Sequence, residues 1–405
     1  MTAQSGGRLP LTGLTVIDCG MVVAGPMIAT LLGDFGADVI KVENRAGGDQ
    51  MRYFGRQRDG LPLHWQLLGR NKRSITLALS KTAGQELFLA LVRATKADIV
   101  IESFRPGTFE KWNLTYDRLR DASPGVCLIH VSGFGQTGPY RDRPGFGTLA
   151  EAMSGFANVL GPADAPPSLP PFPLADSVAA LYGALGVMMA LYHRDVHEGG
   201  PGQSLDVSLL EPLFALLGPH LVEYDQLAVV AVRKGNRTGS APRNTYLTRD
   251  ERWIVIAAST QSVAARLFEA MGRPDLLDDP RFSTNPKRVE NVEVLDEIVS
   301  AWVGARSEAE VMDLLEAADV AVAPILDVSD LATDPQLQQR GTIATVNDPE
   351  LGDVRMPNVL PSLSETPGSI RSSAPRLGEH NREVYGGLLG LSEADIDALR
   401  KEETI

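Results

Sequence analysis

One aspartate occupies a position where a carboxylate could act as a covalent nucleophile. Asp176 follows the proline-rich segment PFPLAD and opens a long apolar stretch that predicts a helix. Aspartate is preferred at a helix N-terminus, where it caps free backbone N–H groups and stabilises the helix by about 1 kcal/mol, and that role needs no chemistry. The same position keeps a carboxylate ionised and fixes its direction, so an activated nucleophile is the second interpretation. The two roles are compatible.

Basic side chains gather near the expected ends of several strands. The segment RNKR at 70–73 is joined by Arg45, Arg105 and Lys111, each at or beyond the C-terminal end of a predicted strand. In an open α/β sheet those ends border the ligand crevice. Because the formal net charge is −13, cations gathered there indicate a polyanionic ligand such as the phosphates of coenzyme A (CoA) or a nucleotide. A solvated charged surface is the alternative.

The segment GFGQTG at 133–138 matches the dinucleotide-binding pattern G-x-G-x-x-G and follows a predicted strand. That pattern requires a helix N-terminus immediately afterwards, which points amides at the pyrophosphate. Pro139 and the segment RDRPG follow instead, which is typical of turns. We therefore expect a loop beside a ligand rather than a nicotinamide site. Its backbone amides are candidates to stabilise an oxyanion, and Gln136 is a candidate polar contact.

Other catalytic patterns are weak in this sequence. His193 and His197 have a spacing that can place two imidazoles on one helix face, but a zinc site needs a further ligand. The EGG segment that follows indicates a solvated helix end, so surface histidines and no metal site are predicted. The sequence contains no G-x-S-x-G elbow, Walker loop or CxxC pair.

The elements that would position these residues alternate between β-branched and amphipathic segments. Strands are predicted at 14–18, 39–43, 98–102 and 127–132, and helices at 26–35 and 82–95. This alternation is typical of a parallel, helix-covered sheet in a doubly wound fold. A long apolar helix is predicted from Asp176 to His193, packed against the sheet or a partner subunit, and a second apolar helix over 205–221.

The second half of the chain predicts a separate small α/β domain. A basic, glycine-containing loop at 233–244 precedes a hairpin, and helices are expected at 261–271, 292–305 and 308–318. The predicted organisation is a large domain over 1–200, a linker helix over 201–224 and a small domain over 225–330. Residues 331–405 would return to complete the large domain.

Composition limits the partners and the compartment. An acidic chain of 405 residues repels nucleic acid and anionic lipid, so neither is expected as a partner. Only two cysteines are present, Cys19 and Cys127, each in an apolar segment, which favours a reducing cytoplasm. The N-terminal segment lacks an apolar signal core, and no apolar run approaches the roughly 20 residues of a membrane span. A soluble protein that is not exported is therefore expected.

The motifs in their order resemble the class III CoA-transferases, a family that includes formyl-CoA and carnitine CoA-transferases and the α-methylacyl-CoA racemases. The segments that carry the resemblance are LPLTGLTVIDCGMVVAGPMIATLLGDFGADVIKVE, RNKRSITL, ESFRPGTFEKW, HVSGFGQTGPYRDRPGFG, PFPLAD and APRLGEH. The resemblance implies a Rossmann-like large domain, an inserted small domain and an interlocked homodimer. It also implies that Asp176 is the nucleophile.

The resemblance further implies which residues bind CoA. The family's CoA-contacting positions fall on Val22, Val23, Ala24, Asn44 or Arg45, Arg73, Ser103, Phe104 and Lys111. Arg105 and the loop residues Ser132, Gly133, Phe134, Gln136 and Tyr140 complete the expected binding set.

Departures from the family pattern narrow the expected activity. Racemases of the family carry a catalytic histidine in a G-H-D segment, and the matching residues here are Gly145, Phe146 and Gly147. The small domain lacks the glycine run of formyl-CoA transferases, which disfavours formyl-CoA:oxalate transfer. Val23 stands where the family has a glutamine beside the acyl group, which also indicates a different acyl donor.

The expected reaction moves CoA from an acyl-CoA donor, with succinyl-CoA as a candidate, to a carboxylic acid, through an aspartyl anhydride and an aspartyl-CoA thioester. CoA is a substrate, and no permanently bound cofactor is expected. Bidentate contacts from arginine would favour a dicarboxylate acceptor; the candidates are Arg141, Arg143, Arg233, Arg237 and Arg243. Two alternatives stay open: an acyl-CoA racemase or isomerase of the same superfamily, and an NAD-dependent oxidoreductase built on GFGQTG.

Overall fold

The computed structural model describes residues 8–196 and 200–405 of the chain. The chain divides into two compact units. The large unit comprises the described residues up to Phe156 together with Leu169–Gln226 and Gln336–Ile405. The small unit comprises Ala157–Ser168 and Leu227–Pro335, so it includes a short segment that lies ahead of Asp176 in the sequence.

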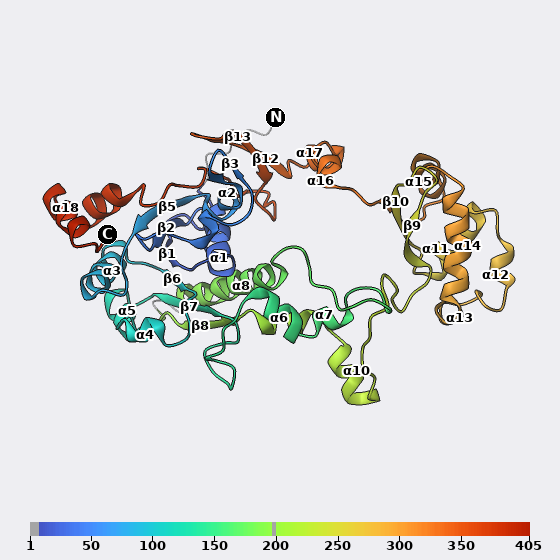
Figure 1. Ribbon diagram of the computed structural model, residues 1–405, viewed down its shortest axis with the longest axis horizontal. Helices are drawn as coiled ribbons and strands as arrows, with labels where there is room; N and C mark the ends of the chain where they lie inside the picture. The colour runs from blue at the N-terminus through green and yellow to red at the C-terminus, as the bar shows by residue number, and fades with distance from the viewer. Residues whose placement is uncertain (1–7, 197–199) are drawn as a thin grey trace. The chain divides into compact units, whose positions relative to one another are not determined.

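A parallel sheet of six strands forms the centre of the large unit (Figure 1). Its strands are β1 (Thr15–Cys19), β2 (Asp38–Glu43), β5 (Lys72–Thr76), β6 (Ile99–Glu102), β7 (Cys127–Ser132) and β8 (Ser204–Ser208). They lie in the order β5-β2-β1-β6-β7-β8, the arrangement of a doubly wound fold, so the predicted parallel α/β sheet is confirmed. The strand order reverses between β1 and β6, and in such sheets the ligand crevice lies beyond the carboxyl ends of those two strands.

Helices cover both faces of this sheet because its strands are apolar on both sides. Val16 of β1 belongs to the core beneath α1 (Ala24–Asp34) and α8 (Leu174–Val196), which lie side by side (Figure 1). Its neighbour Ile17 belongs to the opposite core, beneath α3 (Thr82–Thr95) and α5 (Tyr116–Ala122). The close packing of α1 and α8 needs Gly183, since a Cβ there would lie 2.5 Å from Ile28 Cδ1.

The shorter elements of the large unit lie in the connections between these strands. They are η1 (Gln50–Arg52), β3 (Gln57–Arg58), β4 (Leu61–Pro62), α2 (Leu63–Gly69), α4 (Thr108–Lys111), α6 (Gly147–Met153) and α17 (Pro335–Gln339), the last of which starts at the boundary between the units.

The segment 201–224 does not form the single linker helix that the sequence predicts, and neither does the apolar part over 205–221. That segment begins with the strand β8, which pairs in parallel with β7 from Leu128 opposite Ser204 to Ser132 opposite Ser208. Two short helices follow, α9 (Leu210–Leu216) and α10 (His220–Leu227). The segment SLDVS has the alternating side chains of a strand, and the sheet satisfies its backbone, while the Gly218-Pro219 pair separates the two helices.

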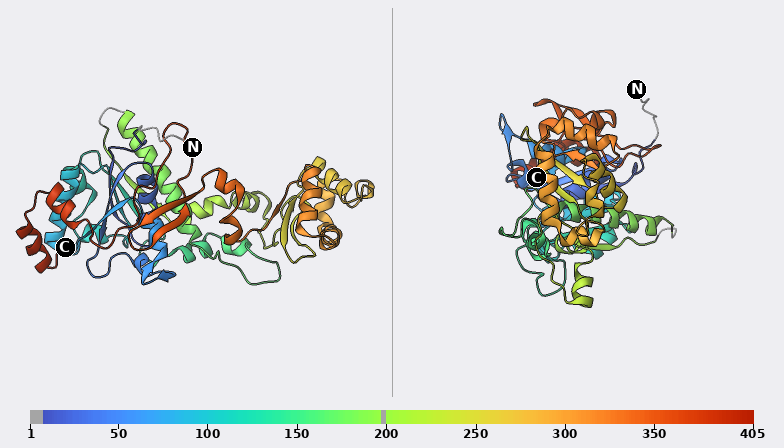
Figure 2. Two further views of the ribbon diagram at one scale, coloured as in Figure 1. Left: turned by 90° about the horizontal axis from the view of Figure 1, so that it is seen from above. Right: turned by 90° about the vertical axis from the view of Figure 1, so that its right-hand side faces the viewer.

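The C-terminal segment returns to the large unit. It forms the hairpin β12 (Ile343–Asp348) and β13 (Gly352–Pro357), the π-helix η2 (Arg382–Leu388) and the helix α18 (Glu393–Lys401), drawn from orange to red in Figure 2. Tyr385 is fully buried and donates its hydroxyl hydrogen to the Thr76 carbonyl at 2.7 Å. Ile396 joins the same core as α3. The core beneath α3 and α5 therefore includes C-terminal residues that lie about 300 positions after the strand they contact.

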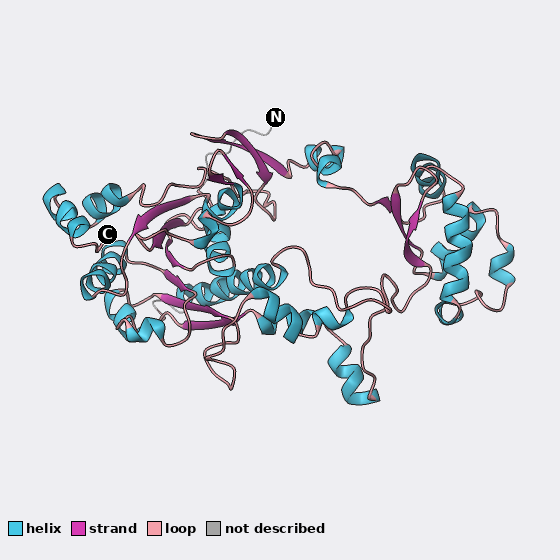
Figure 3. Cartoon of the chain, viewed as in Figure 1, coloured by secondary structure: helices cyan, strands magenta, loops and turns pink. Residues whose placement is uncertain are grey.

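The small unit has its own sheet and core (Figure 3). Its antiparallel sheet has the order β11-β10-β9, with β9 (Arg243–Leu247), β10 (Trp253–Ala257) and β11 (Val322–Pro324). The predicted hairpin is present, as are the three predicted helices, now α11 (Gln261–Ala270), α14 (Val292–Gly304) and α15 (Glu308–Ala317). The remaining helices are α7 (Phe156–Val159), α12 (Asp275–Asp278), α13 (Asn285–Glu290) and α16 (Val328–Leu331).

Helix α8 departs from one expectation. Within residues 8–196 and 200–405 it is the single helix that is long and apolar enough to cross a bilayer, with 23 residues and a mean hydropathy of 1.7 over its best window. The expectation that no apolar segment approaches the length of a membrane span is wrong. Alanine and glycine residues lie between the larger apolar side chains of α8, so its apolar character continues over the whole helix. A core helix of a water-soluble protein passes the same test, so the length of α8 alone is weak evidence for a membrane.

Candidate active site

A cavity of about 650 Å³ opens within the large unit at the carboxyl ends of β1, β6 and β7. Asp176 borders it from the first turn of α8, which begins two residues earlier, at Leu174, so the aspartate lies inside the helix rather than at its N-cap. The cavity lies where the strand order reverses between β1 and β6, which is where ligands bind in doubly wound folds. The other predicted site residues that line it are Val22, Val23, Ala24, Ser103, Phe104, Arg105, Ser132 and Gly133.

The Asp176 carboxyl group is destabilised in its charged form. Burial is the main cause, the negative charge of Glu151 adds to it, and together they raise the pKa of Asp176 to about 6 against a backbone hydrogen bond that lowers it. Glu151 lies on α6, is buried, and accepts a hydrogen bond from the Ala175 N–H at 3.3 Å. At neutral pH most Asp176 is still ionised, and a carboxylate with a raised pKa is more basic and therefore a stronger nucleophile than an ordinary one.

Gly147 leaves the space that the Asp176 carboxylate occupies. A Cβ at Gly147, the first residue of α6, would lie 2.0 Å from Asp176 Oδ2. Gly147 is also the position at which the G-H-D segment of the related racemases carries aspartate. Phe146 stands where those racemases carry the catalytic histidine, so this chain has no histidine at that position. The Asp176 carboxylate occupies the space beside Gly147.

The GFGQTG loop serves close backbone packing. A Cβ at Gly133 would lie 2.5 Å from Gly145 Cα, so two glycines bring this loop against the segment that leads into α6. Turns follow the loop, and the next helix begins only at Gly147. The helix start that a dinucleotide requires does not follow this loop in the described chain. Asp206 fixes the loop instead, accepting a hydrogen bond from the Gln136 N–H at 2.8 Å.

A second cavity of about 350 Å³ shares Met21, Gln50 and Phe104 with the first. Asn44 lines it, and its Oδ1 accepts a hydrogen bond from the Ala46 N–H at 2.9 Å. The two cavities follow the same edge of the sheet, which gives room for an extended ligand rather than a compact one.

Several predicted binding residues lie outside both cavities. Phe134 and Tyr140 contact each other edge to face at 5.9 Å between ring centroids. Arg45 donates to the Arg400 carbonyl at 3.2 Å, and Lys111 is the last residue of α4. Gln136 and these four residues do not line either cavity.

The RNKR segment does not provide the cations expected at the crevice. Arg73 is the second residue of β5, an edge strand of the sheet, and it pairs with Asp38 at 2.5 Å and Glu383 at 2.7 Å. Arg70 pairs with Asp34 at 2.7 Å, and Lys72 is buried against Asp18 at 2.9 Å. The expectation is wrong because residues 70–73 lie at the amino-terminal start of β5, where carboxylates of the large unit pair with these cations.

Two of the five candidate acceptor arginines line the cavity of Asp176. Arg143 stacks on the ring of Tyr140, with its guanidinium carbon 3.9 Å from the centroid, and Arg141 lies 3.5 Å from Asp142. The other three belong to the small unit and already donate within it: Arg233 to Ala165 and Asn158, Arg237 to Asp296 and Glu293, and Arg243 to Asn236.

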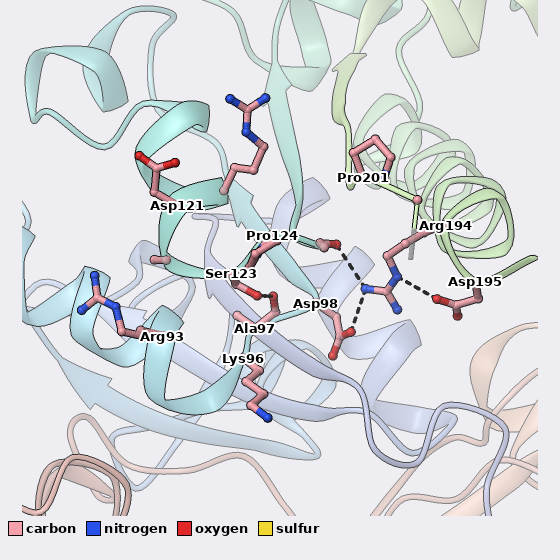
Figure 4. Close-up of a pocket in the computed structure, with 14 residues that line it drawn as sticks. Arg93, Lys96, Ala97, Asp98, Asp121, Ser123, Pro124, Arg194, Asp195 and Pro201 are labelled. Carbon is pink, nitrogen blue, oxygen red and sulfur yellow. Dashed lines mark hydrogen bonds and ion pairs between the residues drawn. The ribbon is translucent and has the colours of Figure 1, made fainter. Parts of the chain in front are cut away.

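A larger hollow, of about 1160 Å³, lies at the amino-terminal edge of the sheet (Figure 4). Arg194 borders it and is held by Asp98 at 2.8 Å and Asp195 at 2.7 Å. None of the predicted site residues line this hollow, so we do not assign the reaction to it. His197 lies outside the described residues, and within the described part of the chain no cluster of three or more potential ligands could hold a metal ion.

Sequence reasoning missed three residues beside the candidate site: Gly147 as a spacer, Glu151 as a charge close to Asp176, and Asp49. Asp49 follows two glycines in the segment GGDQMR, and its carboxylate accepts a hydrogen bond from the Val22 N–H at 3.0 Å. No local pattern signals this contact, because the two residues meet only when β1 and β2 pair.

Comparison with known proteins assigns the chain to a family. Residues 11–381 match the family model described as CoA-transferase family III. The chain belongs to this family. It is 41% identical over 407 residues to the succinyl-CoA–D-citramalate CoA-transferase of Chloroflexus aurantiacus, with both chains covered completely. It is 40% identical over 402 residues to the succinyl-CoA–L-malate CoA-transferase beta subunit of the same organism, with 98% of each chain covered.

A solved structure supports the same assignment. A CaiB/BaiF family protein from Brucella suis matches with a TM-score of 0.83 and 29% identity, over 94% of this chain and 100% of the other. The protein is therefore a family III CoA-transferase, an enzyme that uses CoA thioesters as substrates. The predicted resemblance is confirmed. The oxidoreductase alternative is disfavoured, because the relatives described here are CoA-transferases and no helix start follows GFGQTG directly in the described chain.

The spacer role of Gly147 can be tested by substitution. In Gly147→Ala the added methyl group forces the Asp176 carboxylate away from its position, so CoA transfer should fall by about 100-fold, the cost of a displacement near 1 Å. Steady-state transfer rates and circular dichroism measure activity and fold. Gly387→Ala is the matched control, because its Cβ meets no atom within 4 Å, and it should retain full activity. Equal activity of both variants would contradict the role of Gly147.

The raised pKa of Asp176 predicts the pH dependence of the reaction. Only the ionised carboxylate is a nucleophile, so kcat should fall as the pH drops through about 6, the pKa of this group. Glu151→Gln removes the neighbouring negative charge and should move this acid limb to lower pH, as measured by kcat between pH 4.5 and 8. Glu211→Gln, on α9, should leave it in place. If the acid limb of kcat lies at the same pH in Glu151→Gln as in the wild type, the electrostatic argument is refuted.

Proposed function

We propose that this enzyme transfers CoA from succinyl-CoA to a dicarboxylic acid, with Asp176 as the covalent nucleophile. The observation that carries the proposal is a partly exposed carboxylate, with its pKa raised to about 6, on the wall of a cavity that Arg105, Arg141 and Arg143 also line. The two relatives described above are named for succinyl-CoA as donor and a hydroxy dicarboxylate as acceptor, which supports the substrate class.

The proposed chemistry exchanges one acyl bond for another at every step. Asp176 Oδ attacks the thioester carbonyl of the donor, the carbon–sulfur bond breaks, and CoA thiolate leaves behind a mixed anhydride. The thiolate then attacks the aspartyl carbonyl, which releases succinate and leaves an aspartyl-CoA thioester. The acceptor carboxylate attacks that thioester, which breaks the carbon–sulfur bond, releases CoA thiolate and forms a second mixed anhydride. The thiolate then attacks the acceptor's acyl carbon, which gives the acceptor's CoA thioester and regenerates Asp176. No ATP or metal is needed for these exchanges.

The surroundings of Asp176 supply what this chemistry requires. The first turn of α8 fixes the carboxylate, burial and Glu151 raise its basicity, and Gly147 leaves it room. Gly133 lines the same cavity, and its backbone N–H is the proposed donor to an oxyanion, since the Gly135 and Gln136 N–H groups already donate to Ser132 and Asp206. The partly apolar cavity limits access of water, which would hydrolyse the anhydride.

Arg141 and Arg143 are the proposed recognition groups for the second carboxylate of the acceptor. Both line the Asp176 cavity, and stacking on Tyr140 holds the Arg143 guanidinium in place. Because a guanidinium forms bidentate hydrogen bonds with a carboxylate, such a group selects dicarboxylates over monocarboxylates.

We also propose that the active enzyme is an interlocked homodimer. Helix α8 exposes apolar side chains on the side away from the sheet, among them Leu185 at 54%, Met189 at 62% and Tyr192 at 72% exposure. Leu221, Val222 and Tyr224 of α10 are exposed as well. Apolar surface of this extent is typical of an interface. Since two relatives are named as alpha and beta subunits, a second type of subunit is the alternative occupant.

We further propose that the enzyme acts in the cytoplasm and holds no permanent cofactor. Cys19 and Cys127 are free and buried, and burial raises the pKa of both thiols, so neither is suited to redox chemistry. The exchange of acyl bonds described above consumes no cofactor.

Removal of the nucleophile should abolish transfer. Asp176→Ala and Asp176→Asn should show only background activity, and mass spectrometry of wild-type enzyme incubated with succinyl-CoA and hydroxylamine should find the adduct on Asp176 alone. Because the charged form of Asp176 is disfavoured in the fold, Asp176→Asn should melt at or above the wild-type temperature at pH 8. Light scattering should give a dimer for all three proteins. Normal transfer by Asp176→Ala would refute the proposal.

Loss of a cavity arginine should affect dicarboxylates selectively. Arg143→Ala should raise the KM for a dicarboxylate such as malate by about tenfold, the size expected for one lost charged hydrogen-bonding group. The KM for propionate, which has no second carboxylate, should not change. Arg237→Ala, in the small unit, provides a control in which a guanidinium paired with Asp296 is removed. An equal rise of KM for both acceptors in Arg143→Ala would contradict the assignment.

A further inference from the structure

The turn between β1 and α1 is strained where it borders the cavity. Met21, Val22 and Val23 line the cavity of Asp176, and Val22 has a φ of 66°, in the left-handed region. A β-branched residue is strongly disfavoured there. In the part of the chain that the structure describes, Val22 is the only β-branched residue with a positive φ. Such strain persists only where surrounding contacts impose it.

Two side chains impose the conformation of this turn. The Val22 N–H donates to Asp49 Oδ1 at 3.0 Å, and the adjacent Met21 N–H donates to Ser103 Oγ at 2.7 Å. Asp49 follows β2 and Ser103 follows β6, so the turn is attached to the strands on both sides of β1.

A buried lysine fixes Asp49 in turn. Lys41 Nζ lies 3.0 Å from Asp49 Oδ2, and both side chains are only 1% exposed. Lys41 also donates to the Gly20 carbonyl, so it contacts the start of the same turn. Asp18 lies 3.6 Å from Lys41 and 2.9 Å from Lys72, which brings two lysines and two aspartates together without solvent. Nearby carboxylates raise the pKa of Lys41, so it stays charged.

The turn has little freedom to relax. A Cβ at Gly20 would lie 3.0 Å from Gly25 Cα, so the two ends of the turn are in close backbone contact. Asp49 Oδ1 also accepts a hydrogen bond from the Met51 N–H at 3.0 Å, and Met51 lines the same cavity. One carboxylate therefore sets the position of two segments of the cavity wall.

We propose that Asp49, held by Lys41, is a positioning residue for CoA transfer: it maintains the left-handed Val22 turn, which forms part of the thioester-binding wall of the cavity that Asp176 lines. This inference rests on the proposed function. Asp49 is buried and lines the second cavity but not the cavity of Asp176, so it acts there through its hydrogen bonds to the Val22 and Met51 N–H groups. Its effect should therefore appear in binding of the CoA thioester, which contacts the turn, and not in binding of the carboxylate acceptor.

The test is Asp49→Asn, which preserves size and removes the charge that faces Lys41. The KM for succinyl-CoA should rise about tenfold or more, while the KM for the acceptor stays within about twofold. Asp34→Asn is the matched control, because Asp34 is equally buried and pairs with Arg70 at 2.7 Å, yet it does not line either cavity. It should lower the melting temperature and leave both KM values unchanged. The same KM values in Asp49→Asn and Asp34→Asn would overturn the proposal.

A second substitution tests the mechanism of the effect. Glycine adopts a positive φ without strain, so in the Val22→Gly background the additional effect of Asp49→Asn on the KM for succinyl-CoA should shrink to about twofold. An undiminished effect would overturn the role assigned to the strained turn. If Asp49→Asn does not fold, Ser103→Ala loosens the same turn without disturbing a buried charge and must raise the same KM. The proposed function fails separately, if wild-type enzyme transfers no CoA or Asp176→Ala retains activity.

Discussion

The Asp176 carboxylate is held where its charge is only partly stabilised, and the rest of the site depends on that interaction. Water would stabilise the anion and make it a poor nucleophile, whereas complete burial would neutralise it and block access. The first turn of α8, the nearby Glu151 and the space left by Gly147 together give an intermediate environment, in which the pKa rises to about 6. The anion remains available at neutral pH, yet it is more reactive than a solvated one.

The sheet explains why this environment arises at one edge. Strand order reverses between β1 and β6, so the connections that leave these two strands diverge and open a crevice. The turn after β1 and the loop after β6 form its walls, and the Met21–Ser103 hydrogen bond joins them. Beneath the walls, Lys41, Lys72, Asp18 and Asp49 form a buried ionic cluster. Buried ion pairs contribute little net stability, so their value here is the unique geometry that they impose.

The two units contribute differently to recognition. Arg141 and Arg143 of the large unit line the Asp176 cavity. The three candidate arginines of the small unit, Arg233, Arg237 and Arg243, donate to carboxylates and carbonyls within that unit. The residues that set the chemistry and those proposed to select the acceptor thus lie on one folded unit. The exposed apolar side of α8 is the surface on which the proposed partner subunit would pack.

The sequence by itself determined the parallel α/β sheet, most strand positions, the hairpin of the small unit and the family, because alternating apolar periodicity and ordered motifs are local properties. It also singled out Asp176, since a helix start after a proline-rich turn can be read locally. Only the tertiary structure decided that Arg73 pairs with Asp38, that residues 204–208 are a sheet strand, and that Gly147, Glu151 and Asp49 belong to the site. Each of these contacts joins segments far apart in the chain, so no local pattern encodes it.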